Sequence, residues 1–531
     1  MRHHLLLSLR RPSRTLLAPA ALLVLAACGG GGGSTSSATG DTPNSNGGSP
    51  SAVTLSVQVS GSGTVNASSP ALSCTGDCPT SVTAGTAVTL TAAAATGFQF
   101  AGWEGCTSSG TSCTVTVTAA QTVKAVFLAT PAQSVCQGGF YAATFSLLSN
   151  LSTDLVGWLA KPVKGVAVTE PTYKTCLVRS TDHVADGVAG FTRNDYSRRQ
   201  AFNADSSKYI VYAYNGSWQL YDGVTRNRIK ALAGPAGDAE PQWSETDPDK
   251  LYYLPTNGVG MKVNELTVST GTTRVLGDLS ARIKALWPTA NAAWTKSEGS
   301  PSKDGRYWCL MVDNAAWGSL GVITWDRDTN TILGHMNTNG ERPDHVSMSP
   351  SGNYCVVSGD GARGTVAYSR DFATSRQLLQ KSEHSDIAID ANGDDVYVSV
   401  DYQSQAGDLF MLNLRTGVRT TLFPTYVSGS ATALHVSGKA FSKPGWVVVS
   451  TYGDYGGTQW LHKKVFAVQL SASPKIYNLG FTRAVENGYW TEPHATVNRD
   501  FTKVLFNSNW NVDTDMDVDA YMIEVPAGAV K

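Results

Sequence analysis

The sequence predicts an all-β protein, in which a seven-bladed β-propeller follows a small β-rich module that carries disulfides. Three observations carry this prediction. Apolar and polar residues alternate with period two over most of the chain, as they do in half-buried strands. From about residue 136 a β unit recurs seven times at intervals of roughly 40 to 60 residues, which is typical of a propeller. Nine cysteines suit an oxidising compartment.

The composition limits the function. The 531 residues exceed one ordinary core, so we expect at least two domains. Lys plus Arg number 41 and Asp plus Glu 42, so the basic excess of a nucleic-acid-binding protein is absent. We therefore expect no nucleic acid among the partners.

Residues 1–28 have the pattern of an export signal. A basic start precedes the apolar run Leu16–Leu25, which is too short to span a membrane, and the run closes on "LAAC" at Cys28. This resembles the lipobox of bacterial lipoproteins and implies that Cys28 carries the lipid. Gly29 then favours an outer-membrane anchor, facing either the periplasm or the exterior. An ordinary signal peptide with a chance cysteine is the alternative, and membrane contact is expected through the lipid alone.

Residues 29–51 are rich in Gly, Ser and Thr, which predicts a flexible tether. Residues 52–130 then alternate like strands and contain "GSGTV", "AGTAVTLTA", "FAGWEGC" and "VKAVF". These motifs resemble the divergent internalin-type B-repeat of bacterial surface proteins. The resemblance implies a spacer or adhesion module, and we find no catalytic constellation in it.

The cysteines beyond Cys28 form short-range groups. Four in the module read as two small staples, although four cysteines allow three pairings, and a further pair stands where the second domain begins. The residues expected in disulfides are Cys74, Cys78, Cys106, Cys113, Cys136 and Cys176. Cys309 and Cys355 lie in apolar strands, and we expect buried free thiols there.

The predicted propeller covers residues 136–531, with repeats that begin near residues 200, 240, 298, 342, 383, 434 and 492. Each repeat has a polar start, a strand, a turn built on Asp, Ser, Asn or Gly, and a second strand. The last repeat is short of strands, so we expect residues 174–183 to supply its outer strand and close the ring. Turns such as "SPSG" at 349–352 resemble those of the TolB/WD40-like secreted propellers. A two-sheet sandwich would not explain seven similar units.

Histidines gather at one position of the repeat, at or beside the start of the innermost strand. In a propeller these starts converge at one mouth of the channel, so the side chains would face each other. Neutral imidazoles and carboxylates in a concave site suit a divalent metal or an acid/base pair. The predicted metal ligands are His345, His384, His435 and His494, and the predicted ligand-binding residues are Gln200, Glu298, Asp386, Arg199 and Glu492. The alternative is that such residues only join neighbouring blades.

The stretch "EPHATVNRDFTKVLFNSNW" from Glu492, with "DVDAYMIEV" after it, resembles the closing repeat of the oligogalacturonate lyase propellers. Those lyases hold a divalent metal at the propeller mouth and cleave acidic glycans by β-elimination. The complete metal set of the lyases is not matched here, and the sequence fixes no catalytic base. Trp294, Trp460 and Trp490, which we expect in loops, would suit stacking on sugar rings. We expect a cell-envelope lipoprotein whose propeller binds a carbohydrate or an envelope protein, with a metal-assisted polysaccharide lyase as the alternative.

Overall fold

The computed structural model describes residues 51–95, 98–129, 136 and 139–531. Cys28 and most of the tether lie outside these residues. Among the described residues, helix is confined to α1 (Ser280–Leu286) and the short 3-10 turns η1 (Thr256–Gly258) and η2 (Tyr489–Thr491). None of these segments has the length and apolar character needed to cross a membrane. The prediction of an all-β protein is confirmed.

Two sheets form the N-terminal module. One sheet has the order β4 (Cys78–Thr83), β1 (Ala52–Ser60), β9 (Gln121–Ala129) and β6 (Phe98–Glu104). The other has the order β3 (Ala71–Cys74), β2 (Gly63–Ser68), β5 (Thr86–Ala94), β8 (Ser112–Val117) and β7 (Thr107–Ser109). Val88, Leu90 and Ala92 alternate with exposed residues along β5 and enter the module core, as period two requires.

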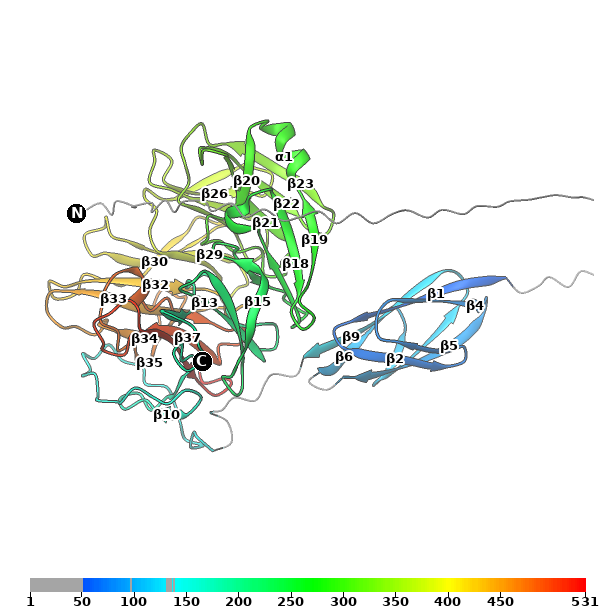
Figure 1. Cartoon of the computed structure of the whole chain (residues 1–531), viewed down its shortest axis with the longest axis horizontal. Coiled ribbons are helices and arrows are strands. Elements are labelled where there is room, and N and C mark those ends of the chain that lie inside the picture. Colours follow the sequence, from blue (N-terminus) through cyan, green and yellow to red (C-terminus); the bar gives the residue numbers. More distant parts are fainter. Residues whose placement is uncertain (1–50, 96–97, 130–135, 137–138) are drawn as a thin grey trace, which may run out of the picture. The chain divides into compact units, whose positions relative to one another are not determined.

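Five separate four-stranded antiparallel sheets follow in chain order in the second domain. Their strands are β16 (Gln242–Trp243), β17 (Lys250–Tyr253), β18 (Lys262–Thr267), β19 (Thr272–Asp278); β20 (Ala290–Trp294), β21 (Tyr307–Asn314), β22 (Ser319–Asp326), β23 (Thr331–Asn337); β24 (His345–Met348), β25 (Tyr354–Ser358), β26 (Thr365–Ser369), β27 (Ser375–Leu379); β28 (Ser385–Ile389), β29 (Asp395–Asp401), β30 (Asp408–Asn413), β31 (Arg419–Pro424); β32 (Ala431–Ser437), β33 (Trp446–Tyr455), β34 (Lys464–Gln469) and β35 (Ile476–Phe481). In Figure 1 these sheets succeed one another in colour from green to orange.

A nine-stranded sheet joins the two ends of this domain. Its strands are β10 (Ala167–Thr169), β11 (Cys176–Arg179), β38 (Val518–Glu524), β12 (Phe191–Arg193), β13 (Lys208–Ala213), β14 (Ser217–Asp222), β15 (Arg228–Ala236), β36 (Thr496–Val497) and β37 (Lys503–Ser508). β11 pairs antiparallel with the C-terminal β38, which is the outer strand expected from residues 174–183. Counting this sheet as two blades gives the seven that the repeats predict.

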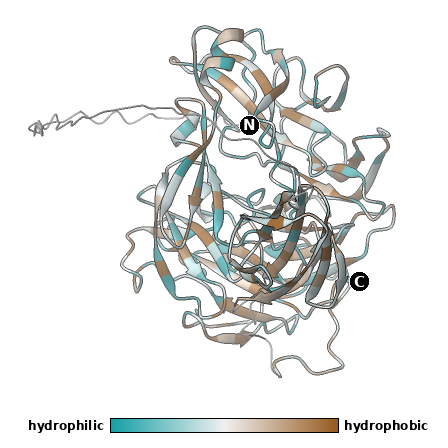
Figure 2. Ribbon diagram, turned by 90° about the vertical axis from the view of Figure 1, so that its right-hand side faces the viewer, coloured by the Kyte–Doolittle hydropathy of each residue, from teal (hydrophilic) through white to brown (hydrophobic). Residues whose placement is uncertain are grey.

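Apolar side chains on the strands pack between neighbouring sheets. One core cluster contains residues of β21, β22, β24 and β25, and another contains residues of β33, β34, β37 and β38. In Figure 2 the brown, hydrophobic segments fall mainly on the strands. The sheets therefore stabilise one another through their faces, as propeller blades do.

The structure pairs Cys74 with Cys78 and Cys106 with Cys113, and joins Cys136 to Cys176 on β11. The remaining two cysteines correct an expectation. Cys309 and Cys355 are not free thiols but form a disulfide. They lie on β21 and β25, the second strands of adjacent sheets, and both enter the core between those sheets. Their separation of 46 residues is one repeat, which is the sequence signal for the pair.

A second difference concerns the repeat that begins at Glu298. The innermost strand of that sheet is β20, which ends before Glu298, at Trp294. The following segment pairs with the next sheet, because Val346 donates a backbone hydrogen bond to Thr295 and Met348 donates one to Ser300. Glu298 therefore stands on a crossing between two sheets and not at a strand start.

Candidate functional site

Three of the four predicted histidines meet at one place. The ring centroids of His384 and His435 are 4.3 Å apart, and those of His435 and His494 are 4.2 Å apart. His384 directly precedes β28, His435 lies on β32, and His494 lies between η2 and β36. The successive repeats thus bring residues that are far apart in sequence into one cluster.

Glu492 joins two of these histidines. One carboxylate oxygen, Oε2, is 2.8 Å from Nε2 of His435 and 3.2 Å from Nε2 of His494. The ligand atoms of these three residues all lie within 4.8 Å of one another, which is close enough to hold a metal ion. Two imidazoles and a carboxylate are a donor set that Zn²⁺, Mn²⁺ and related cations take.

Hydrogen bonds determine which ring nitrogen carries the proton. Arg193 lies 2.8 Å from Nδ1 of His494. Because a guanidinium can only donate, Nδ1 accepts, and the proton of the neutral ring is on Nε2, which donates to Glu492. In His384, Nδ1 faces the carbonyl oxygen of Leu434 at 2.8 Å and therefore donates, so Nε2 presents a lone pair. Nδ1 of His435 is buried without a partner among the described residues.

Burial keeps these imidazoles neutral. His435 and His494 are 1% and 0% exposed. Burial lowers the pKa of His494 well below its usual range, and His435 and Arg193 lower it further. Burial likewise lowers the pKa of His435 and that of His384. Neutral imidazoles are the form that ligates metals or accepts a proton.

The fourth histidine belongs to a second group. Nδ1 of His345 lies 3.4 Å from Asp344 and 3.6 Å from Glu298. Burial raises the pKa of Asp344, but the hydrogen bond to His345 and the charge of Lys296 outweigh it and hold this pKa below its usual value. The guanidinium of Arg198 bonds both Glu298 and the backbone oxygen of Ser385, so it stands between this group and the strand after His384.

Three other predicted ligand-binding side chains form hydrogen bonds or ion pairs within the protein. Asp386 pairs with Lys439 at 2.9 Å, and Gln200 donates to the backbone oxygens of Lys439 and Val497. Arg199 bonds Asp195, although its Nη1 has no partner among the described residues. The structure does not gather these three around the histidines, and their role in ligand binding stays a prediction.

Sequence reasoning missed the aromatic residues around the histidines. The ring of Tyr452 stacks on that of His435 with 5.0 Å between the ring centroids. The ring centroids of Tyr196 and His494 are 4.9 Å apart. A signal existed for Tyr452, because it lies on β33, the second strand of its repeat, opposite Ala433 and so two residues from His435 on β32. The tryptophan prediction was wrong for Trp294 and Trp460, which are 6% and 7% exposed and pack in the core.

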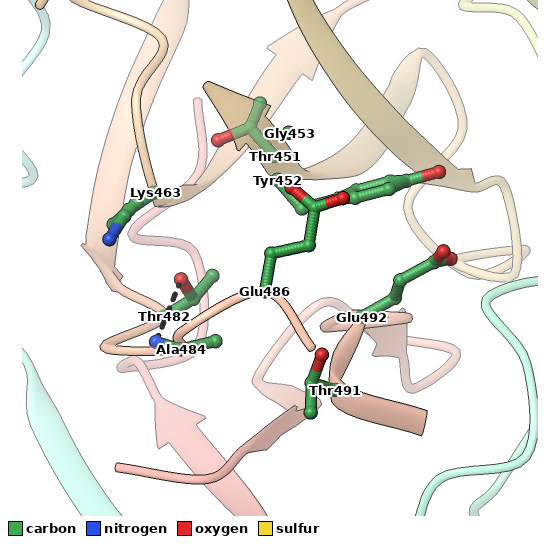
Figure 3. Close-up of a pocket in the computed structure, with 9 residues that line it drawn as sticks. All are labelled: Thr451, Tyr452, Gly453, Lys463, Thr482, Ala484, Glu486, Thr491 and Glu492. Atoms are coloured by element: carbon green, nitrogen blue, oxygen red, sulfur yellow. Dashed lines mark hydrogen bonds between the residues drawn. The ribbon is translucent and has the colours of Figure 1, made fainter. Parts of the chain in front are cut away.

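A cavity of about 180 Å³ adjoins the histidine cluster. Its lining residues are Thr451, Tyr452, Gly453, Lys463, Thr482, Ala484, Glu486, Thr491 and Glu492. Figure 3 shows Lys463, Thr482 and Ala484 on one side, Tyr452 and Glu492 on the other, and Glu486 projecting between them. The cavity shares Tyr452 and Glu492 with the cluster.

Comparison with known proteins bears on each domain separately. Residues 53–131 match the model of the divergent InlB B-repeat domain. The resemblance predicted for the N-terminal module is thereby confirmed. No curated protein sequence matches the chain.

The propeller resembles solved structures. An oligogalacturonate lyase in complex with manganese is 14% identical, with a TM-score of 0.51, and the match covers 70% of this chain and 98% of the lyase. An oligogalacturonate lyase from Vibrio parahaemolyticus is 13% identical, with a TM-score of 0.48 and coverage of 68% and 99%. TolB from Acinetobacter baumannii is 15% identical, with a TM-score of 0.29 and coverage of 51% and 63%. At these identities the first match shows the propeller fold alone. The TM-scores of the other two are below 0.5, and we conclude nothing from them.

Proposed function

We propose that the propeller binds a divalent metal through His435, Glu492 and His494, and that the metal site binds an acidic carbohydrate. The observation that carries the proposal is the convergence of two neutral imidazoles on one carboxylate oxygen. Buried histidines that only join blades would have no need of a shared carboxylate.

The donor set supports a metal. Nε2 of His435 donates to Glu492, and its Nδ1 has no partner among the described residues, so the ring proton can move to Nδ1 when a cation takes Nε2. In the metal-free state Nε2 of His494 carries a proton, so a cation can take this atom only when the proton moves to Nδ1, which the hydrogen bond from Arg193 opposes. Of metals with imidazole and carboxylate ligands, Mn²⁺ is our first choice, because an oligogalacturonate lyase with this fold is seen with manganese.

The acidic carbohydrate follows from the surroundings of the site. A divalent cation held by one carboxylate keeps positive charge for a ligand carboxylate, whereas the nearby Arg198 is already paired with Glu298. A carboxylate on a sugar ring is the ligand that this charge favours. An envelope protein could bind the same metal site through an acidic side chain, and it is the other partner that we propose.

A second candidate function is a polysaccharide lyase, and the lone pair on Nε2 of His384 favours it. When bound, a divalent cation polarises a uronate carboxylate and so acidifies the neighbouring C–H. His384 would take that proton, a C–C double bond would form, and the glycosidic C–O bond would break as its oxygen takes up a proton. Tyr452, 3.3 Å from Nδ1 of His384, would hold the ring in place.

Binding and lysis are separated by one experiment on the purified protein. It is incubated with polygalacturonate and Mn²⁺, and both retention of the polymer and the absorbance of unsaturated products are followed. Retention without new absorbance supports binding, and Mn²⁺-dependent absorbance that His384→Ala abolishes supports the lyase. Neither retention nor absorbance would contradict both functions.

We also propose that lipidation of Cys28 anchors the protein to the outer membrane. The lipobox pattern of residues 1–28 supports it. In cells that produce Cys28→Ala, membrane fractionation should find the protein in the soluble fraction instead of the membrane fraction. Unchanged membrane association would contradict the anchor.

A further inference from the structure

The cavity beside the histidine cluster is built from three segments that hydrogen bonds fix in place. Thr451 donates to the backbone oxygen of Leu461 and accepts from Lys464. Thr491 donates to Gly488 and accepts from Asn487. These hydroxyls bind the backbone, so the lining is formed before any ligand arrives, which lowers the entropic cost of binding.

One charge in this lining has no partner. Lys463 has no hydrogen bond or ion pair for its ammonium group within the part of the chain that the structure describes, although its neighbour Lys464 pairs with Asp154. The side chain of Lys463 is half-buried and lines the cavity. Its backbone φ is 52°, a conformation uncommon outside glycine, and its backbone oxygen is fixed by a hydrogen bond from Thr482.

The geometry of the cavity sets the size of its ligand. Its volume of about 180 Å³ lies below the ~300–1,000 Å³ of sites for drug-sized ligands. This suits a single sugar unit. Lys463 and Glu492 lie on opposite sides of the cavity, with Glu486 projecting between them (Figure 3), so one ligand unit that faces both also meets Glu486.

We propose that this cavity is a subsite for one anionic sugar unit, whose carboxylate pairs with Lys463 while the rest of the ligand reaches Glu492. The inference rests on the proposed function, because it places the ligand beside the metal site. Lys463 is then the residue that distinguishes an acidic sugar from its neutral counterpart. Gly453, which has φ 61°, also lines the cavity.

Calorimetric titration of the full chain tests the subsite with two probes, a galacturonate trisaccharide and the matching neutral galactose trisaccharide, each with and without Mn²⁺. In Lys463→Met we expect about tenfold weaker galacturonate binding or more, because a charge-assisted pair is lost. Lys463→Arg should stay within about threefold of wild type, and binding of the neutral sugar should not change. Lys303→Met removes the same charge from an exposed turn and should have no effect.

Three outcomes would overturn the subsite. The first is equal galacturonate affinity in wild type and Lys463→Met. The second is an equal loss of affinity for the acidic and the neutral sugar in Lys463→Met. The third is no galacturonate binding by Mn²⁺-loaded wild type. Titration with Mn²⁺ alone separates this from failure of the proposed function, since Lys463→Met should bind Mn²⁺ as wild type does. Galacturonate binding that depends on Lys463 in a protein that binds no Mn²⁺ would keep the subsite and reject the metal site.

Discussion

Arg193 controls which nitrogen of His494 faces Glu492. Its guanidinium is buried, lies 4.7 Å from the ring centroid of Trp490, and donates to Nδ1 of His494. This contact fixes the proton on Nε2, which is the atom that a metal would take. Arg193 is therefore a competitor of the cation, through both the tautomer that it imposes and its charge.

We predict that Arg193→Met binds Mn²⁺ several-fold more tightly than wild type. Without the arginine, Nδ1 can carry the ring proton and Nε2 becomes a free donor atom. Methionine keeps the apolar contacts with the aromatic rings. Titration calorimetry with Mn²⁺ measures the change, and weaker binding would show that Arg193 supports the metal instead of opposing it.

Glu240 makes stability depend on pH. This buried carboxylate accepts hydrogen bonds from the backbone of Thr295 and Ser297, yet burial raises its pKa to about 7. A pKa raised on folding contributes stability that is fully present below the unfolded value, about 4.5, and is lost as the pH rises through about 7.

The predicted loss for Glu240 is at most about 3 kcal/mol between pH 5 and pH 9. Glu240→Gln cannot ionise, so its stability should fall less over this range, although it starts lower because one acceptor becomes a donor. Denaturant titrations of both proteins at several pH values measure the difference. Parallel pH curves would show that another group is responsible.

At the scale of elements, the ring is closed by strands from both ends of the domain. Arg179 on β11 pairs with Asp519 on β38 at 2.6 Å, and Asp519 is 0% exposed. Arg226, which precedes β15, bonds Glu524 at the end of β38. Both pairs therefore tie β38 to segments from the start of the domain, in addition to its backbone ladders.

The disulfide between β21 and β25 ties two adjacent sheets. We predict that the double variant Cys309→Ala/Cys355→Ala is less stable by about 4 kcal/mol, because the bond closes a loop of 46 residues. Differential scanning calorimetry should show a lower transition for the propeller. Cys106→Ala/Cys113→Ala changes only the N-terminal module and is the control.

Thiol titration of the denatured, unreduced protein gives an independent check on this bond. Cys309 and Cys355 should give no reactive thiol until a reductant is added. Two reactive thiols from this pair would restore the free-thiol interpretation of the sequence.

At the scale of the whole molecule, repetition made the fold predictable and left the site only partly so. The recurring turns located the sheets, and the shortened last repeat located the closing strand β11. The same counting misplaced Glu298, because the chain crosses to the next sheet at that point, and a crossing has no signature in period or turn residues.

The histidines show the same limit. His345 and His494 share a position in the repeat, and His384 and His435 lie two or three residues upstream of it. In space His494 meets His384 and His435, whereas His345 joins Asp344 and Glu298. Repeat position fixes the height of a side chain in the channel, but its partners depend on rotamers and on long side chains such as Arg198 that fill the mouth.

Metal content tests the central claim most directly. After dialysis against Mn²⁺ and then metal-free buffer, elemental analysis should find a single equivalent of manganese in wild type and in His345→Ala, whose histidine lies in the separate group. His435→Ala and Glu492→Ala should each lose it. Wild-type protein without manganese, or variants at His435 and Glu492 that retain it, would contradict the metal site.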